Sequence, residues 1–62
     1  MKIDIEKLRS HLINYFGLAS YYNPNAMIDI VRVQNATDEE IINIAVENNF
    51  KLEDFMIKGY SL

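Results

Sequence analysis

The sequence predicts an all-α fold: a single domain over residues 1–62, built as a compact array of three to four short helices. Three observations predict it. Apolar residues recur at helical spacing in several segments, one helix start carries a full set of capping residues, and only one proline and two glycines interrupt the chain. Half of the residues are hydrophobic, which is too many for an intrinsically disordered chain. Because so short a chain has little core and this one has no cysteine, we expect dense packing or self-association to stabilise it.

The first helix is expected over about residues 5–20, with Asp4 as its N-cap. Its apolar face is formed by Ile5, Leu8, Leu12, Tyr15, Phe16 and Ala19. Gly17 leaves two alternatives open, because it either ends the helix or lies inside a longer helix where a neighbour packs closely. We favour the longer helix, since the two residues that follow Gly17 suit a helix.

The second helix is expected over about residues 24–33. Asn23 is a good N-cap, and Pro24 is tolerated at the first helical position, where its missing N–H would be unpaired anyway. Three apolar residues then fit one helix face: Met27, Ile30 and Val31. Residues 28–33 are also rich in β-branched residues and could form a strand. We favour the helix because the chain offers no second clear strand to pair with.

The third helix is expected over about residues 38–48, and its start is the strongest signal in the chain. Thr37 and Glu40 form a capping box, and the three acids at positions 38–40 lie where the helix dipole favours negative charge. Apolar residues cover most of the circumference, which suits the central element of a bundle: Ile41, Ile42, Ile44, Ala45 and Val46. Asn48 and Asn49 supply the stop, after which Phe50 is expected to fold back on the helix end.

A fourth, short helix is expected over about residues 52–58, and the last residues, 59–62, are expected to fray. Its inward side chains would be Leu52, Phe55 and Met56.

The residues that carry chemistry in enzymes are few and isolated here. His11 is the sole histidine, and helical spacing gives it no nucleophile or carboxylate, so a solvent-facing or partly packed role is favoured. The acids at 38–40 lack the alternating oxygen ligands and glycine of a calcium loop, and helix capping explains them. There is no glycine-rich phosphate loop. We therefore expect no enzyme activity, no cofactor and no metal site.

Charge and hydropathy limit the classes of partner that the chain is expected to have. The net charge is −3, and the six basic residues are scattered, so nucleic acid is not an expected partner. No segment approaches the roughly 20 apolar residues of a membrane span, nor is there a signal-peptide core, so no membrane association and a cytoplasmic location are expected. A nucleic-acid-associated regulator of the helix-turn-helix type is the alternative function, although residues 52–58 would offer only Lys58 as a cation and residues 38–48 carry four acids.

A non-enzymatic protein–protein interaction module, which binds a protein partner or a second copy of itself, is the function that these observations favour. Tyrosine, methionine and arginine are enriched at protein interfaces. The candidate interaction surface is therefore Tyr21, Tyr22, Met27 and Arg32. Core or boundary packing is the alternative for the aromatic residues, and an ion pair with Asp29 on the same helix is the alternative for Arg32.

Two resemblances accompany these patterns. The runs 25–29, 32–33, 35–40, 44–45 and 49–50, together with an aromatic-aromatic-glycine segment at 15–17, resemble a group of small uncharacterised bacterial proteins, mostly of Gram-positive bacteria. That resemblance covers about residues 8–56 and implies a small cytoplasmic helical protein, with no activity established for the group. Residues 36–56 are also similar to nitrogen-fixation-type leader peptides of ribosomally made natural products. Those leaders carry glycine where Asn49 stands and precede a cleavable core, so this likeness implies a shared helix hairpin and not a shared function.

Overall fold

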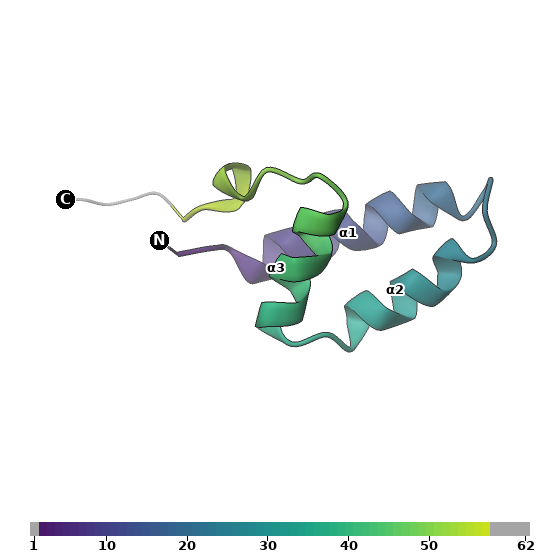
Figure 1. The fold of residues 1–62 in the computed structure, drawn as a ribbon, viewed down its shortest axis with the longest axis horizontal. Coiled ribbons are helices and arrows are strands. Elements are labelled where there is room, and N and C mark those ends of the chain that lie inside the picture. Colours follow the sequence, from purple (N-terminus) through teal and green to yellow (C-terminus); the bar gives the residue numbers. More distant parts are fainter. Residues whose placement is uncertain (1, 58–62) are drawn as a thin grey trace.

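The computed structural model describes residues 2–57 and contains three α-helices followed by one short 3-10 helix (Figure 1). The elements are α1 (Ile5–Ala19), α2 (Ala26–Gln34), α3 (Asp38–Glu47) and η1 (Leu52–Phe55). Helices α1 and α2 form an antiparallel hairpin, and α3 crosses α1 near the end of the hairpin that holds the N-terminus. The predicted all-α fold is confirmed.

Helix α1 begins at the predicted cap and continues through Gly17. The Asp4 carboxylate accepts a hydrogen bond from the backbone N–H of Lys7 at 3.1 Å, which satisfies one of the unpaired donors of the first turn. Gly17 lies inside the helix, and the position where a Cβ would stand has no heavy atom within 4 Å. The favoured longer helix is thus confirmed, but no neighbour packs closely on this glycine.

Helix α2 starts two residues later than predicted. The side chain of Asn23 accepts from the backbone N–H of Asn25 at 3.1 Å, and the N–H groups of residues 26–28 bond to carbonyls three residues back. Pro24 and Asn25 therefore form a tight turn that leads into the helix, and regular α geometry begins at Ala26. Residues 28–33 are helical, so the strand alternative is wrong.

Both ends of α3 follow the predicted capping pattern. The backbone N–H of Thr37 donates to the Glu40 carboxylate at 2.8 Å, and the Glu40 N–H donates to the Thr37 hydroxyl at 3.2 Å. These hydrogen bonds from Thr37 lower the pKa of Glu40. At the other end Asn49 has a φ of 65°, and the Phe50 N–H bonds to the Ala45 carbonyl at 2.9 Å. This pattern is a Schellman cap, and it turns the chain back towards α1.

The predicted fourth helix is wrong in length and in kind. Only residues 52–55 form a helix, of the 3-10 type, and Met56 instead pairs with Ile3 in an isolated antiparallel bridge. The Asp4 N–H donates to the Phe55 carbonyl at 2.7 Å, and this hydrogen bond joins the same two segments as the bridge. Met56 lies partly in solvent and not inward, because extended backbone at residue 56 ties the segment to the N-terminus. Residues 58–62, including the segment expected to fray, lie outside the described residues.

The hydrophobic core lies between the N-terminal part of α1, the end of α2, α3 and η1. Its members are Leu8, Leu12, Phe16, Val33, Ala36, Ile41, Ile44, Ala45 and Phe55. Helix α1 contacts α2, α3 and η1, so α1 and not α3 is the central element. Val46 on α3 is more than half exposed. The predicted central position of α3 is therefore wrong, because its apolar residues also cover a side that no other element reaches.

Candidate interaction surface

The outer end of the α1–α2 hairpin lacks the second layer that covers the other end. Helix α3 and η1 pack against the part of α1 that holds Leu8 and Leu12, which are fully buried. Beyond Phe16, α1 is paired with α2, and the two helices meet solvent at the turn over residues 20–25 (Figure 1). Apolar side chains at this end are therefore placed at the surface by the fold itself.

An open groove runs between α1 and α2 on this end of the hairpin, with a volume of about 580 Å³. It is lined by Ile13, Asn14, Gly17, Leu18, Tyr21 and Ile30. Five of these residues are spaced along α1 and the turn after it, and Ile30 comes from α2. Asn14 is the one polar side chain among them apart from the tyrosine hydroxyl. The groove is therefore an apolar surface and not a site with converging catalytic groups.

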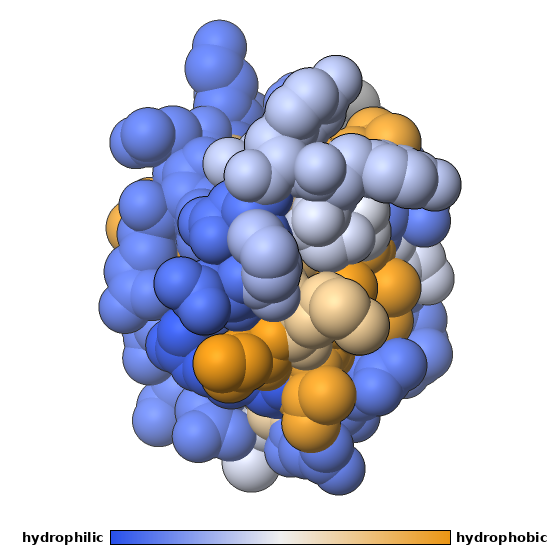
Figure 2. All heavy atoms as spheres, turned by 90° about the vertical axis from the view of Figure 1, so that its right-hand side faces the viewer, coloured by the Kyte–Doolittle hydropathy of each residue, from blue (hydrophilic) through white to orange (hydrophobic). Residues whose placement is uncertain are grey.

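Exposed apolar residues of α2 extend this groove. Met27 and Val31 are four residues apart and are neighbours on the helix surface, and Met27 is also one turn before Ile30. Both Met27 and Val31 are more than half exposed. We refer to the combined surface as the hairpin face, defined by Ile13, Leu18, Tyr21, Met27, Ile30 and Val31. Figure 2 shows apolar atoms gathered in one patch, bordered by hydrophilic ones, when this end of the molecule faces the viewer.

The buried side of α2 differs from the apolar face that the sequence indicated. Met27, Ile30 and Val31 fit one helix face, but the residues buried on α2 are Ala26 and Val33. Ala26 and Val33 are seven residues apart and so share a stripe with each other, and this stripe faces α1.

Charge is absent from this end of the molecule. Residues 10–28 contain no aspartate, glutamate, lysine or arginine. The next two charges along the chain, Asp29 and Arg32, lie 3.8 Å apart and balance each other. The net charge of −3 is therefore carried by the remaining segments, outside the α1–α2 hairpin end.

Of the four residues proposed from the sequence, the structure brings Tyr21 and Met27 to the hairpin face. Tyr21 is 83% exposed and lines the groove, while Met27 is 62% exposed on α2. Tyr22 is 93% exposed in the turn and does not line the groove. Leu18 and Val31 were not singled out from the sequence. The absence of charge over residues 10–28 is a signal that could have indicated Leu18, but it does not extend to Val31.

Arg32 lies on a different side of α2 and is engaged within the molecule. Its guanidinium group is 3.8 Å from the Asp29 carboxylate and 3.6 Å from that of Glu47 on α3. Residues 27 and 32 are separated by about 140° around a helix, so Met27 and Arg32 do not share a face. The ion pair with Asp29 that was the alternative for Arg32 is present, and the contact with Glu47 also links α2 to α3.

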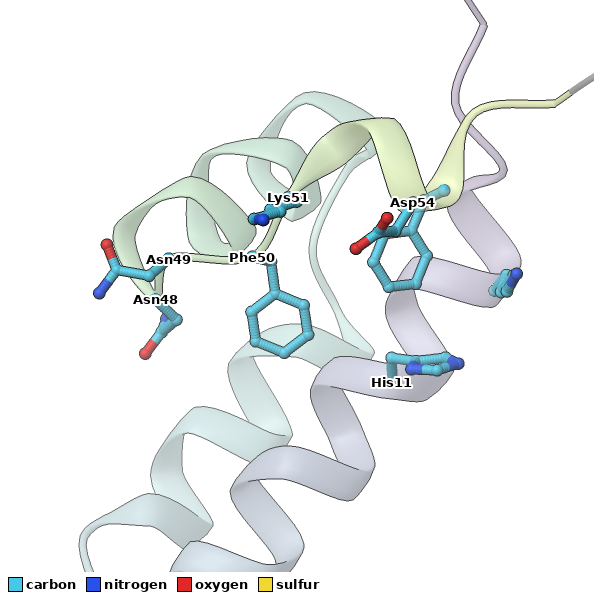
Figure 3. A pocket seen from close by; sticks show the side chains of 8 residues that line it. His11, Asn48, Asn49, Phe50, Lys51 and Asp54 are labelled. Atoms are coloured by element: carbon cyan, nitrogen blue, oxygen red, sulfur yellow. The ribbon is translucent and has the colours of Figure 1, made fainter.

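A second cavity of about 490 Å³ lies between α1, the end of α3 and η1, and its character is different (Figure 3). Two aromatic residues, Phe50 and Phe55, line it. Its polar lining consists of Lys7, His11, Asn48, Asn49, Lys51 and Asp54. The side chains of Asn48 and Asn49 point away from His11 and Asp54, and the Asn48 amide already donates to the Ile44 carbonyl at 2.8 Å. His11 stacks edge-to-face on Phe55 at a centroid distance of 5.0 Å. Asn48 and Asn49 thus do not converge with His11 and Asp54 on one point.

Arg9 is a structural residue that the sequence analysis left unassigned. Its guanidinium Nη1 donates to the carbonyl of Val33 at 2.8 Å and to that of Ala36 at 3.0 Å. These carbonyls lie at the end of α2, where the last groups lack helical partners and the helix dipole favours a cation. Arg9 therefore holds the end of α2 against α1.

The remaining sequence candidates stay apart in the structure. Across residues 2–57, no three side chains of the histidine, aspartate or glutamate type gather closely enough to hold a metal ion. Among the described helices, none combines the length and the apolar character that crossing a bilayer requires. Of the segments considered for nucleic-acid recognition, 52–55 is a single short 3-10 helix, and α3 carries four acids and no basic residue.

Comparison with known proteins gives no relative for this chain: no family model, no curated protein and no solved structure matches it.

Proposed function

We propose that this protein is a small, non-enzymatic protein-interaction module that binds through the hairpin face. The observation that carries the proposal is the grouping of exposed apolar side chains from two helices around one groove, most of which is formed by residues 10–28, a stretch without charged side chains. Scattered exposed apolar residues are normal on proteins, but a contiguous patch rimmed by polar residues is typical of interaction sites.

The size of the hairpin face supports this proposal. Leu18, Tyr21, Met27 and Val31 expose between 57% and 83% of their surface. With Ile13 and Ile30 they present on the order of 500 Å² of side chain to solvent, from the usual area of such side chains. This area lies near the upper end of the largest patch on an ordinary monomer, about 300–600 Å², and such patches are often functional.

The shape of the groove supports binding over catalysis. A surface that does chemistry needs a nucleophile, a base or an electrostatic stabiliser within reach of one point. The hairpin face instead offers aliphatic side chains, one amide and one tyrosine hydroxyl. These groups can bury area and accept a few hydrogen bonds, which is what a protein partner requires.

Site-specific photo-crosslinking in cells tests this proposal. A photo-reactive phenylalanine derivative is placed at position 31, on the hairpin face, or at position 46, on α3, because Val31 and Val46 are 57% and 55% exposed and so equally accessible. We expect a discrete protein adduct from position 31 and none from position 46. Equal labelling from both positions, or no adduct from position 31, would contradict the proposal.

A further inference from the structure

We infer that the occupant of the hairpin face is a second copy of this chain, so that two hairpins pack face to face in a twofold-symmetric dimer. This inference rests on the proposed function and names the partner of the same surface. Three observations favour a second copy over a different protein: the charge distribution, the missing second layer and the area available.

The charge distribution suits a surface that must meet itself. In a twofold-symmetric interface residue i contacts residue j and j contacts i, so only a charged residue near the axis meets its own copy and a charge of like sign. The hairpin end avoids this cost, because residues 10–28 carry no acidic or basic side chain. The acids of α3 and η1 lie at the other end of the molecule, which such a dimer would hold apart. A partner that is recognised through opposite charge would have no charged side chain to pair with over residues 10–28.

The fold leaves a two-helix layer that a second hairpin completes. Helices bury their apolar stripes by packing in two layers, and four helices around a shared core are a common stable solution. At the outer end of the hairpin, α1 and α2 form one layer, with Leu18 and Val31 on its open side. A second copy presents a layer of the same length and the same apolar groove.

The area available sets the strength of the dimer. About 500 Å² from each copy gives on the order of 1,000 Å² in total, which is the lower bound for a specific interface. We therefore expect a weak, reversible dimer with a Kd on the order of 10–100 µM, and not an obligate one.

Sedimentation equilibrium of the whole chain over a range of concentrations tests the inference. The 7.2 kDa chain is expected to approach twice that mass as concentration rises. Val31→Lys is expected to raise the Kd at least about tenfold, because symmetry places two added charges in one apolar interface. The matched control is Val46→Lys, which has the same exposure and the same change in net charge and is expected to leave the Kd within about twofold. Leu18→Lys repeats the test from α1 should the first variant lose helix content by circular dichroism.

Salt dependence provides a second readout. Because the interface carries no charge, the Kd is expected to change less than about threefold between low and high ionic strength. A tenfold change, or equal effects of Val31→Lys and Val46→Lys, would overturn the inference. A wild-type chain that remains monomeric up to about 1 mM would also overturn it. In that case a position-31 adduct with a protein of another mass would still support the proposed function, whereas the lack of any adduct would refute both.

Discussion

Replacing Gly17 by alanine is expected to stabilise the protein, although Gly17 lies in the hairpin groove. Glycine in a helix interior costs about 1 kcal/mol relative to alanine, because it loses more backbone freedom on folding. The new methyl group would meet no heavy atom within 4 Å, so no steric cost opposes this gain. Gly17 stands two residues before the end of α1, where fraying weakens the effect. We therefore expect a rise of about 0.5–1 kcal/mol in the free energy of unfolding.

Urea and thermal unfolding, followed by circular dichroism, measure this change. For a domain of this size the expected gain corresponds to a rise in Tm of about 2–8 °C. The measurement is made at low protein concentration, so that dimer formation does not contribute. Ser10→Gly is the mirror control, because Ser10 is exposed on the same helix and its replacement is expected to lower stability by about 0.5 kcal/mol. A Gly17→Ala variant of unchanged or lower stability would show that α1 does not continue through residue 17 as a helix.

Three other contacts give predictions that urea unfolding can check. Because hydrogen bonds from Thr37 lower the pKa of Glu40, this carboxylate contributes stability that is complete above its unfolded pKa and is lost as pH falls through its lower folded pKa. Glu40→Gln is expected to flatten the acid side of the stability profile, and an unchanged profile would contradict the capping box. Arg9→Met is expected to lower stability by roughly 1.5–3 kcal/mol, because two carbonyls lose a charged donor, with Arg9→Lys recovering part of it; equal stability of Met and Lys variants would argue against these bonds. Asn49→Ala is expected to cost about 1 kcal/mol at its left-handed backbone, whereas Asn49→Gly is expected to match or exceed the wild type, and the reverse order would refute the Schellman cap.

Helix ends were predictable wherever side chains act on their own backbone. Asp4, Thr37 and Asn49 each satisfy or redirect groups within five residues, so their effect depends little on the rest of the fold. The start of α2 was less predictable, because Asn23 and Pro24 can begin either a helix or a tight turn. The turn prevails here, since i to i+3 hydrogen bonds precede the regular helix.

Contacts between distant segments were not predictable from local patterns. Residues 52–58 were expected to be helical, yet Met56 pairs with Ile3, more than fifty residues away, and this bridge extends the backbone there. No local pattern assigned a role to Arg9, which bonds to carbonyls at residues 33 and 36. Neither contact leaves a periodic signal in the sequence, because each joins one residue to a partner chosen by the fold.

The same limit explains the candidate surface. Periodicity shows that a helix has an apolar stripe, but it does not show whether another element covers that stripe. The apolar residues of α3 suggested a central helix, yet Val46 is exposed. The apolar face indicated for α2 includes Met27 and Val31, which are exposed as well. Tyr21 and Met27 lie exposed on the hairpin face, whereas Arg32 lies on another side of α2 and pairs with Asp29 and Glu47.

The separation of charge from apolar surface gives the molecule two ends with different physical roles. The end with the core also carries most of the acids, and its net negative charge opposes contact between molecules there. If α1 and α2 served only to cover the core, polar side chains at Leu18 and Val31 would be equally compatible with the two helices and would make the chain more soluble. Apolar residues at those positions are a liability unless they become buried, and a second hairpin is the nearest surface of the same size and charge. Repulsion at one end and burial at the other then lead to the same arrangement, in which two copies meet at their outer ends.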